Sequence, residues 1–305
     1  ETIRLRLPEP LAPGAAELEL EWSGRFTEGL RGLYQAGPLA VTQFEAADAR
    51  RLFPCFDEPG FKASWSLTLE APKGVAVLSN ARPASGDDLG DRVRVSFAET
   101  PPLASYLVAL AAGKLEATRP ETVRGVPVRT WAVPEKIRLA GFGQEVAVAV
   151  LPRLEDYFGL PYAFGKLDQL AVPDFEAGAM ENAALVTYRE VMLLLDPATA
   201  SLAQQKRVAE VVTHELAHQW FGDWLTCKSW GHLWLNESFA DYFECLWEEE
   251  HNGFDDFLVH LEETRQGYYE EAAKQYKRPI VTHKFVEAED MLDNHTYNKG
   301  CGVLP

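Results

Sequence analysis

The stretch His214-Glu215-Leu216-Ala217-His218 restricts the possible folds of this chain more than any other part of its sequence. It lies in a run over 208–221 without a helix-breaking residue, so we expect an α-helix there. Residues four apart on a helix differ by about 40° in direction and about 6 Å in height, so both histidines can reach one metal ion. Glu215 lies about 100° round the helix, where it can hold a water molecule without binding the metal itself. The apolar residues of this run would also suit an ordinary core helix, so a third ligand has to decide between the two interpretations.

Glu237 is the candidate third ligand. Two histidines supply half of a tetrahedral zinc shell, so another protein ligand and a place for water are needed. The short-range extension seen in one class of zinc enzymes would need glycine and histidine where Phe221 and Trp224 stand. Glu237 lies 19 positions after the second histidine, in a predicted helix over 233–242. It is flanked by Leu233, Trp234, Leu235 and Phe239, so we expect it to be buried. A buried carboxylate needs a partner or a metal. We therefore predict one Zn²⁺ bound by the two histidines and Glu237.

Composition narrows the function classes. The chain has 305 residues, 47% of them hydrophobic, which is enough for two domains. The net charge of -17 argues against binding to nucleic acid or to anionic membrane surfaces. No apolar run approaches the length of a membrane span. The sequence thus indicates a soluble protein and leaves its compartment open, with the cytoplasm slightly favoured. The four cysteines are widely spaced, so we expect free thiols.

The first part of the chain, 1–118, is predicted to be an incomplete β-rich domain. Apolar and polar residues alternate with a period of two, which indicates strands with one buried face, over 3–7, 18–22, 65–69 and 93–97. A largely apolar strand is also expected over 105–110. Turns are predicted at 13–14, 72–74 and 85–88. The segment Thr42–Pro59 is too rich in aromatic and charged residues for a plain linker, although a packed loop would also explain it.

The second part, 119–305, is predicted to mix strands and helices. A strand is expected over 126–131, and a helix over 144–157 that Pro152 should kink. Two strands are expected over 167–172 and 183–188, followed by the two metal-site helices and a helix over 254–276. The fold class predicted is therefore α+β. Because the chain starts at Glu1 without methionine and stops inside an expected helix, we expect a fragment of a longer protein.

Four separate motifs carry a resemblance to one family. They are Gly178-Ala179-Met180-Glu181-Asn182, the HExxH stretch with Glu237, Thr296-Tyr297-Asn298-Lys299-Gly300, and the segment Thr42–Pro59. Together they resemble the M1 family of zinc aminopeptidases, which are gluzincins of the aminopeptidase N type. The resemblance implies an antiparallel β-rich N-terminal domain followed by a thermolysin-like mixed α/β catalytic domain, here truncated at its C-terminal end. It covers the chain from about residue 30 to its end.

The resemblance also implies a role for each matching residue. His214, His218 and Glu237 would bind zinc, and Glu215 would be the general base that polarises the zinc-bound water. Tyr297 would stabilise the oxyanion. The substrate, a peptide with a free N-terminus, would be bound by Glu45, Gly178, Ala179, Met180, Glu181 and Asn182. In that set Glu181, helped by Glu45, would bind the α-ammonium group.

The chain departs from the family pattern in places, and other functions compete with the one the resemblance implies. Cys301 stands where the family usually has alanine, which should cost little. The family has more β structure before residue 1 and a helical domain after residue 305, so a piece of this length could have poor activity. The rivals are a thermolysin-type zinc endopeptidase, the epoxide hydrolase branch of the same family, and a non-catalytic scaffold. The Gly178–Asn182 motif counts against the first, and the complete ligand set counts against the last.

Overall fold

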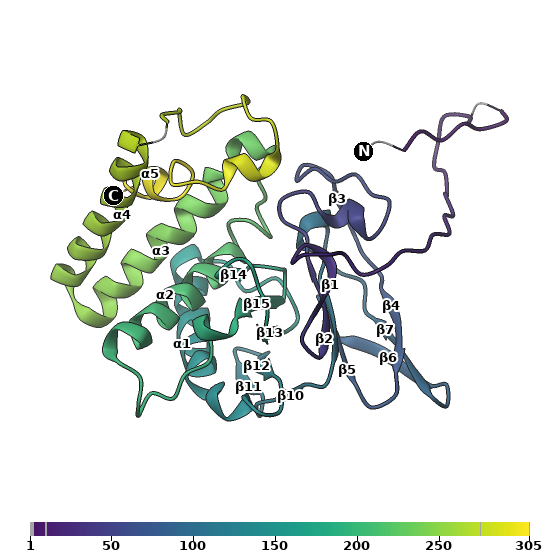
Figure 1. Ribbon diagram of the computed structural model, residues 1–305, viewed down its shortest axis with the longest axis horizontal. Helices are drawn as coiled ribbons and strands as arrows, with labels where there is room; N and C mark the ends of the chain where they lie inside the picture. Colours follow the sequence, from purple (N-terminus) through teal and green to yellow (C-terminus); the bar gives the residue numbers. More distant parts are fainter. Residues whose placement is uncertain (1–2, 10, 275, 305) are drawn as a thin grey trace.

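The computed structural model describes residues 3–9, 11–274 and 276–304, and it shows a β-rich first part followed by a mixed α/β part that ends in helices. In Figure 1 the β-rich part lies on the right and the helices lie on the left. The predicted α+β class and its order along the chain are confirmed. The predicted boundary near residue 118 stays a prediction; the first strand that pairs within the second part is β10 (Glu116–Ala117).

The β-rich part contains three antiparallel sheets. The four-stranded sheet has the order β1-β2-β9-β5, from β1 (Gly32–Ala36), β2 (Leu39–Gln43), β9 (Leu110–Gly113) and β5 (Ala76–Ser79). The three-stranded sheet has the order β4-β7-β6, from β4 (Thr68–Pro72), β7 (Arg92–Phe97) and β6 (Pro83–Asp88). A short pair joins β3 (Lys62–Ala63) to β8 (Leu103–Ala104). The β1–β2 hairpin turns tightly at Gly37, whose φ of 55° suits glycine, and it places the end of β2 beside the second part of the chain.

The second part of the chain contains a six-stranded sheet with the order β10-β12-β13-β15-β14. Strand β11 (Glu121–Val123) also pairs with β12. Its central strands are β12 (Val126–Ala132), β13 (Leu167–Val172) and β15 (Leu185–Arg189), which run parallel. Every residue of β13 is buried, as expected for a parallel strand covered on both faces. The edge strand β14 (Ala179–Met180) pairs with β15 in the antiparallel direction.

The helices are α1 (Gly141–Phe158), α2 (Leu202–His218), α3 (Trp234–Asn252), α4 (Phe254–Lys274) and α5 (Asn298–Cys301). Within the described ranges, six short 3-10 helices occupy Ala49–Arg51, Ser105–Leu107, Ile137–Leu139, Glu190–Met192, Trp230–His232 and Ala288–Met291. Helix α2 begins with a capping box, in which the Ser201 hydroxyl accepts from the Gln204 backbone N–H and the Gln204 side chain accepts from the Ser201 N–H. Helices α2 and α3 pack against each other, so the two predicted metal-site helices are neighbours.

Most predicted elements are confirmed, with bounds that differ by a few residues. The predicted strand over 167–172 coincides with β13, the strand over 93–97 lies within β7, and the helix predicted from 254 begins there as α4. Helix α1 contains Pro152 as expected, although the predicted kink stays a prediction. Helix α2 begins before the predicted range, at Leu202, where the capping box of Ser201 starts it, and it ends at His218. Helix α3 continues past the predicted range to Asn252.

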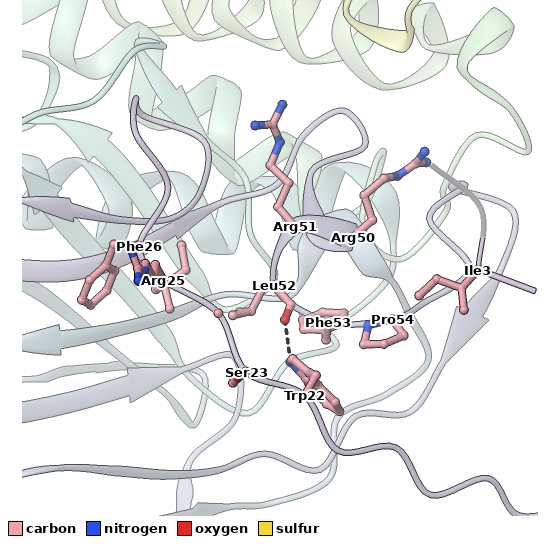
Figure 2. A pocket seen from close by; sticks show the side chains of 12 residues that line it. Ile3, Trp22, Ser23, Arg25, Phe26, Arg50, Arg51, Leu52, Phe53 and Pro54 are labelled. Atoms are coloured by element: carbon pink, nitrogen blue, oxygen red, sulfur yellow. Dashed lines mark hydrogen bonds between the residues drawn. The ribbon is translucent and has the colours of Figure 1, made fainter.

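The strands predicted over 3–7 and 18–22 are wrong, because both segments are extended chain without strand pairing among the described residues. Their large apolar side chains are exposed to solvent, with Ile3 67% exposed and Trp22 55% exposed. Alternation supplies an apolar face, but a strand also needs a neighbour that satisfies its backbone groups. Trp22 instead donates from Nε1 to the carbonyl of Leu52 at 2.7 Å, beside a cavity of about 400 Å³ (Figure 2).

Two further predictions in the first part are wrong. Residues 85–88 belong to strand β6, and the turn follows at Leu89-Gly90-Asp91, where the φ of 93° at Gly90 requires glycine. That strand is exposed along its whole length, so it carries no hydrophobic signal.

Residues 105–110 do not form one continuous strand, because Ser105–Leu107 is a 3-10 helix. The side chain of Asn80 donates to the carbonyl of Leu107 and accepts from the N–H of Ala109, both at 2.8 Å. These bonds take the place of a strand partner.

Candidate active site

Helix α2 carries three of the predicted site residues, and its sequence explains why they face inward. Its buried residues recur with helical spacing and include Glu215 and His218. The helix ends at His218, and Gly222 follows with a φ of 144° in a tight turn. A Cβ at this glycine would lie 3.2 Å from Nδ1 of His218, so the turn and the second histidine constrain each other.

The side chains of His214, His218 and Glu237 converge on one point. The two Nε2 atoms are 3.0 Å apart, and Oε2 of Glu237 lies 3.4 Å from His214 Nε2 and 3.2 Å from His218 Nε2. Ligands of a tetrahedral zinc ion at about 2.0–2.1 Å are separated by about 3.3–3.4 Å. The three atoms thus have nearly the spacing that one zinc ion requires, and the donor set of two imidazoles and one carboxylate suits that metal.

The charge distribution around this triangle also favours a cation. Although burial opposes its charged form, the histidines lower the pKa of Glu237 to about 2. Burial likewise opposes a charge on His218, yet Glu181 and Glu237 raise its pKa to about 10. The carboxylates therefore draw protons onto the imidazoles, and a metal ion that replaces those protons meets the same negative field.

Acidic residues of α3 orient the first histidine from outside. Nδ1 of His214 lies 2.7 Å from Oε1 of Glu244 and 3.2 Å from Oδ1 of Asp241. Such partners fix which ring nitrogen carries the proton and leave the other free for a metal. Nδ1 of His218 lies 3.0 Å from the carbonyl oxygen of Phe221. Asp241 and Glu244 were not predicted from the sequence, although they follow Glu237 at four and seven positions, on the same face of the helix.

Glu215 is buried beside the triangle. Burial raises its pKa to about 8, and the neighbouring histidines oppose that rise. Its Oε2 atom is buried and has no hydrogen-bond partner within the described ranges, and the same holds for Oε1 of Glu45 and of Glu181. Unpartnered buried carboxylate oxygens are costly, so these three atoms indicate a site built for a ligand.

A second carboxylate group lies at the edge of the triangle. Glu45 follows β2 and Glu181 follows β14, and the structure brings an oxygen of each within 4.8 Å of the other and of an oxygen of Glu237. Burial and the charge of Glu181 raise the pKa of Glu45 well above its ordinary value, and burial also raises the pKa of Glu181. Two neighbouring carboxylates with raised pKa values form a place where a positive group of a ligand would be stabilised.

The residues of the Gly178–Asn182 motif separate into two groups. Ala179 and Glu181 line the site cavity, whereas the side chains of Met180 and Asn182 are buried away from it. The amide of Asn182 donates to the Thr187 hydroxyl at 3.1 Å, inside the sheet. The binding roles expected for all five residues of the motif stay predictions.

Gln219, which the sequence analysis also missed, joins this motif to the metal-site helix. It lies one position after the second histidine, is 1% exposed, and donates from Nε2 to the carbonyl of Glu181 at 2.8 Å. Its Oε1 accepts from the backbone N–H of Ala184 at 3.1 Å. The only sequence signal is an amide residue inside an apolar run, which requires buried hydrogen-bond partners.

Tyr297, the residue before α5, also lines the cavity. Its ring is nearly parallel to that of His214, with centroids 6.3 Å apart and an interplanar angle of 16°. Burial and the charge of Glu237 raise its pKa well above the ordinary value, so its hydroxyl keeps its proton and can donate. The turn before it is fixed because Ser238 donates to the carbonyl of Thr296. A Cβ at Gly300 would lie 1.7 Å from Oγ of Ser238, so glycine is required for this close approach.

The metal-site triangle, Glu215, the carboxylate pair and Tyr297 share one cavity of about 220 Å³. Its lining consists of Arg31, Gln43, Glu45, Glu176, Ala177, Ala179, Glu181, His214, Glu215, His218, Glu237, Leu292 and Tyr297. Five of these residues were not predicted from the sequence: Arg31, Gln43, Glu176, Ala177 and Leu292. The cavity is formed by residues from both parts of the chain, as ligand sites often are.

Comparison with known proteins gives two matching family models. The one described as "Peptidase family M1 domain" matches residues 142–305, and the one described as "Peptidase M1 N-terminal domain" matches residues 1–107. None of the helices in the described ranges is both long and apolar enough to cross a lipid bilayer.

Several curated proteins are similar over the whole chain. Aminopeptidase M1-B of Oryza sativa subsp. japonica is 39% identical over 317 residues, covering 100% of this chain and 36% of the relative. Aminopeptidase M1 of Arabidopsis thaliana is 37% identical, with the same coverage of 100% and 36%. Glutamyl aminopeptidase of Sus scrofa is 36% identical and covers 100% of this chain and 34% of its own length. The chain thus spans about a third of the length of these relatives.

Proposed function

The chain belongs to peptidase family M1, a family of metallopeptidases, and from this premise we propose that it is the catalytic core of a zinc aminopeptidase that hydrolyses the N-terminal peptide bond of peptides. The observation that carries the proposal is the juxtaposition, in one cavity, of the histidine–glutamate triangle with the carboxylate pair Glu45 and Glu181. The triangle fits a metal, and the pair fits a free α-ammonium group at a fixed distance from it. We assign residues 1–118 to an N-terminal domain and 119–305 to the catalytic domain on the same basis.

The metal we propose is one zinc ion held by His214, His218 and Glu237. The nearly tetrahedral spacing of the three donor atoms supports this assignment, as do the carboxylates that orient His214 from outside. When bound, zinc supplies a Lewis acid and lowers the pKa of a water molecule to about 7.

Glu215 is the proposed general base. Its carboxylate is buried next to the triangle, and its unpartnered Oε2 can accept the proton of an attacking water. The pKa of about 8 that burial gives it falls as positive charge gathers at the triangle, so the group can take a proton and then return it to the leaving amine. Because Glu215 itself returns the proton to the leaving amine, the reaction needs no separate general acid.

Glu181 and Glu45 are proposed to bind the substrate's α-ammonium group. A desolvated ammonium group needs negative partners, and each carboxylate has a buried oxygen without a hydrogen bond in the part of the chain described. Strand β14 is an edge strand of the six-stranded sheet, so the main chain of a peptide can add to it as a further strand. Tyr297 donates from its protonated hydroxyl to the carbonyl oxygen as it becomes negative.

The test compares one peptide in its free and its N-acetylated form, in wild type and in the Glu181→Gln variant of the full-length protein. We expect the variant to lose at least about tenfold in kcat/KM on the free peptide, because the ammonium anchor also sets the position of the scissile bond. The acetylated peptide should be poor in the wild type and lose little more in the variant.

The matched control is Glu190→Gln, since Glu190 pairs with Lys136 at a distance from the cavity and should behave as wild type. Equal losses on both peptides would remove Glu181 as the ammonium anchor. Efficient wild-type cleavage of the acetylated peptide would instead support the rival function of a zinc endopeptidase.

A further inference from the structure

We propose that the β1–β2 hairpin positions the substrate-binding edge strand β14. It does so through Tyr34, which lies in β1, and Arg31, which directly precedes β1. These two residues hold what we call the approach segment, residues 173–178, which leads directly into β14. The inference rests on the proposed function, in which a peptide pairs with the free edge of β14. It assigns positioning roles to two residues that lie outside all four sequence motifs.

Side chains hold the carbonyl groups of the approach segment, since the segment lies outside the strands. The hydroxyl of Tyr34 donates to the carbonyl of Asp174 at 3.0 Å, and Tyr34 is 0% exposed. Arg189, at the end of β15, donates from Nε to the carbonyl of Phe175 at 3.1 Å and from Nη2 to the carbonyl of Glu176. Three successive carbonyls are thus fixed by residues from both parts of the chain, so neither part alone determines where the segment lies.

Arg31 adds a contact with the side chain of Glu176, which belongs to the approach segment. Its Nε donates to Oε2 of Glu176 at 2.9 Å, and its Nη1 lies 3.3 Å from Oε1 of Glu289. Arg31 and Glu176 both line the site cavity, together with Leu292 from the segment after Glu289. Since the Arg31 side chain is 39% exposed, its charge interaction is partly screened, and its main effect is the geometry of the bond to Glu176.

The position of the segment decides where a substrate strand can pair. The carbonyl of Gly178 accepts from the N–H of Arg189 at 2.9 Å, which holds the inner side of the motif to β15. The outer edge must present its groups within about 2.7–3.2 Å of a peptide main chain. A shift of the approach segment by even part of an ångström would therefore weaken pairing along β14.

The same hairpin also carries Glu45, two residues after the end of β2. One small rigid unit, two paired strands joined by a tight turn, therefore holds both the ammonium-binding carboxylate and the approach segment. Its geometry sets the distance between the point where the substrate's N-terminus is bound and the edge along which its main chain runs. This distance must match the peptide for its main chain to pair along β14 while its N-terminus is bound.

The test uses the variants Tyr34→Phe and Arg31→Gln in the full-length protein. Each is assayed on a single aminoacyl amide, which has no main chain beyond its first residue, and on a pentapeptide with the same N-terminal residue. We expect KM for the pentapeptide to rise by about threefold to tenfold, the range of one lost hydrogen bond, with kcat within about twofold. Both constants for the aminoacyl amide should stay within about twofold, because that substrate does not pair along β14.

Matched controls separate this effect from loss of a hydroxyl or a charge elsewhere. Tyr157→Phe removes the hydroxyl of a tyrosine on α1 that is 63% exposed. Arg94→Gln breaks the ion pair of Arg94 with Glu70 in the three-stranded sheet. Both controls should match the wild type on both substrates.

Hydrogen exchange of the amides over 174–182 provides a readout that does not depend on activity. We expect faster exchange there in Tyr34→Phe and Arg31→Gln than in the wild type and the two controls, with unchanged exchange in α2. If exchange rises and the wild type cleaves neither substrate, the positioning role stands and the proposed function fails. Unchanged exchange, or equal losses on both substrates, would overturn the positioning role even if the wild type is an active aminopeptidase.

Discussion

Glu244 should control how tightly the metal binds, although it is not a ligand. Its Oε1 lies 2.7 Å from Nδ1 of His214, which makes it the nearer of two carboxylates that orient the ring. The variant Glu244→Gln keeps the length of the side chain but removes its charge, so the amide oxygen can still accept while the attraction for the N–H weakens. We expect the metal to remain bound at saturation but with a lower affinity.

The size of the loss follows from the two partners of His214. Losing an outer partner of a metal-bound histidine costs about tenfold to a hundredfold in metal affinity, or about 1.4–2.7 kcal/mol. Asp241 lies 3.2 Å from the same Nδ1 and can replace Glu244, so the single variant should lose about tenfold. The double variant Asp241→Asn with Glu244→Gln has no charged replacement and should lose about a hundredfold.

The assay is competition for zinc against a chromophoric chelator at neutral pH, with folding checked by circular dichroism. Glu248→Gln is the matched control, because Glu248 lies one turn further along α3, is buried, and accepts from Lys206 and Asn252 but from no histidine. It should change the zinc Kd by less than about twofold. If the folded double variant binds zinc with the wild-type Kd, then the carboxylates of α3 do not support the metal and the reasoning is refuted.

Four further outcomes test the site and the fold. Glu215→Gln should abolish turnover with zinc still bound, and metal analysis that finds no zinc would show that its role is misassigned. Glu237→Ala should lose zinc, so stoichiometric zinc at normal affinity would exclude Glu237 as the third ligand. Tyr297→Phe should lower kcat by about a hundredfold or more with KM little changed, whereas a change in KM alone would make it a binding residue. Burial opposes the charge of Asp168, but Lys166 at 2.8 Å lowers its pKa, so its contribution to the free energy of unfolding should be present above about pH 4 and lost below it. Urea unfolding should accordingly show Asp168→Asn destabilised at pH 7 and converging on the wild type as the pH falls, and a constant difference would contradict this.

The two histidines and β13 could be predicted because their geometry is local, whereas Glu45, Glu181 and Tyr297 were expected only through motifs that resemble those of the family. His214 and His218 share a face because of helical spacing, and Glu237 was identified by its place in an apolar helix. The strand β13 was predictable because an uninterrupted apolar run needs cover on both faces. For the histidines and β13 the decisive information lies within a few residues, whereas Glu237 also needed its distance of 19 positions from His218.

What could not be predicted depends on partners that are distant in the sequence. The alternation over 3–7 and 18–22 is real, but alternation does not reveal whether a neighbouring strand exists. Gln219 is recognisable only when the carbonyl of Glu181 is seen beside it, and Tyr34 only when the carbonyl of Asp174 is. Single hydrogen bonds between distant segments leave no period in a sequence, so such positions are found only in the folded structure.

The site cavity joins residues from almost the whole length of the chain, and this has a consequence for how the protein folds. Glu45 and Tyr297, which both line it, are 252 positions apart. Contacts of such separation carry a large entropy of loop closure and form late. During synthesis the metal-site helices α2 and α3 emerge before Tyr297. The three metal ligands are therefore available in the nascent chain before the lining of the cavity is complete. Completion of the site therefore has to wait for the last few residues of the chain described here.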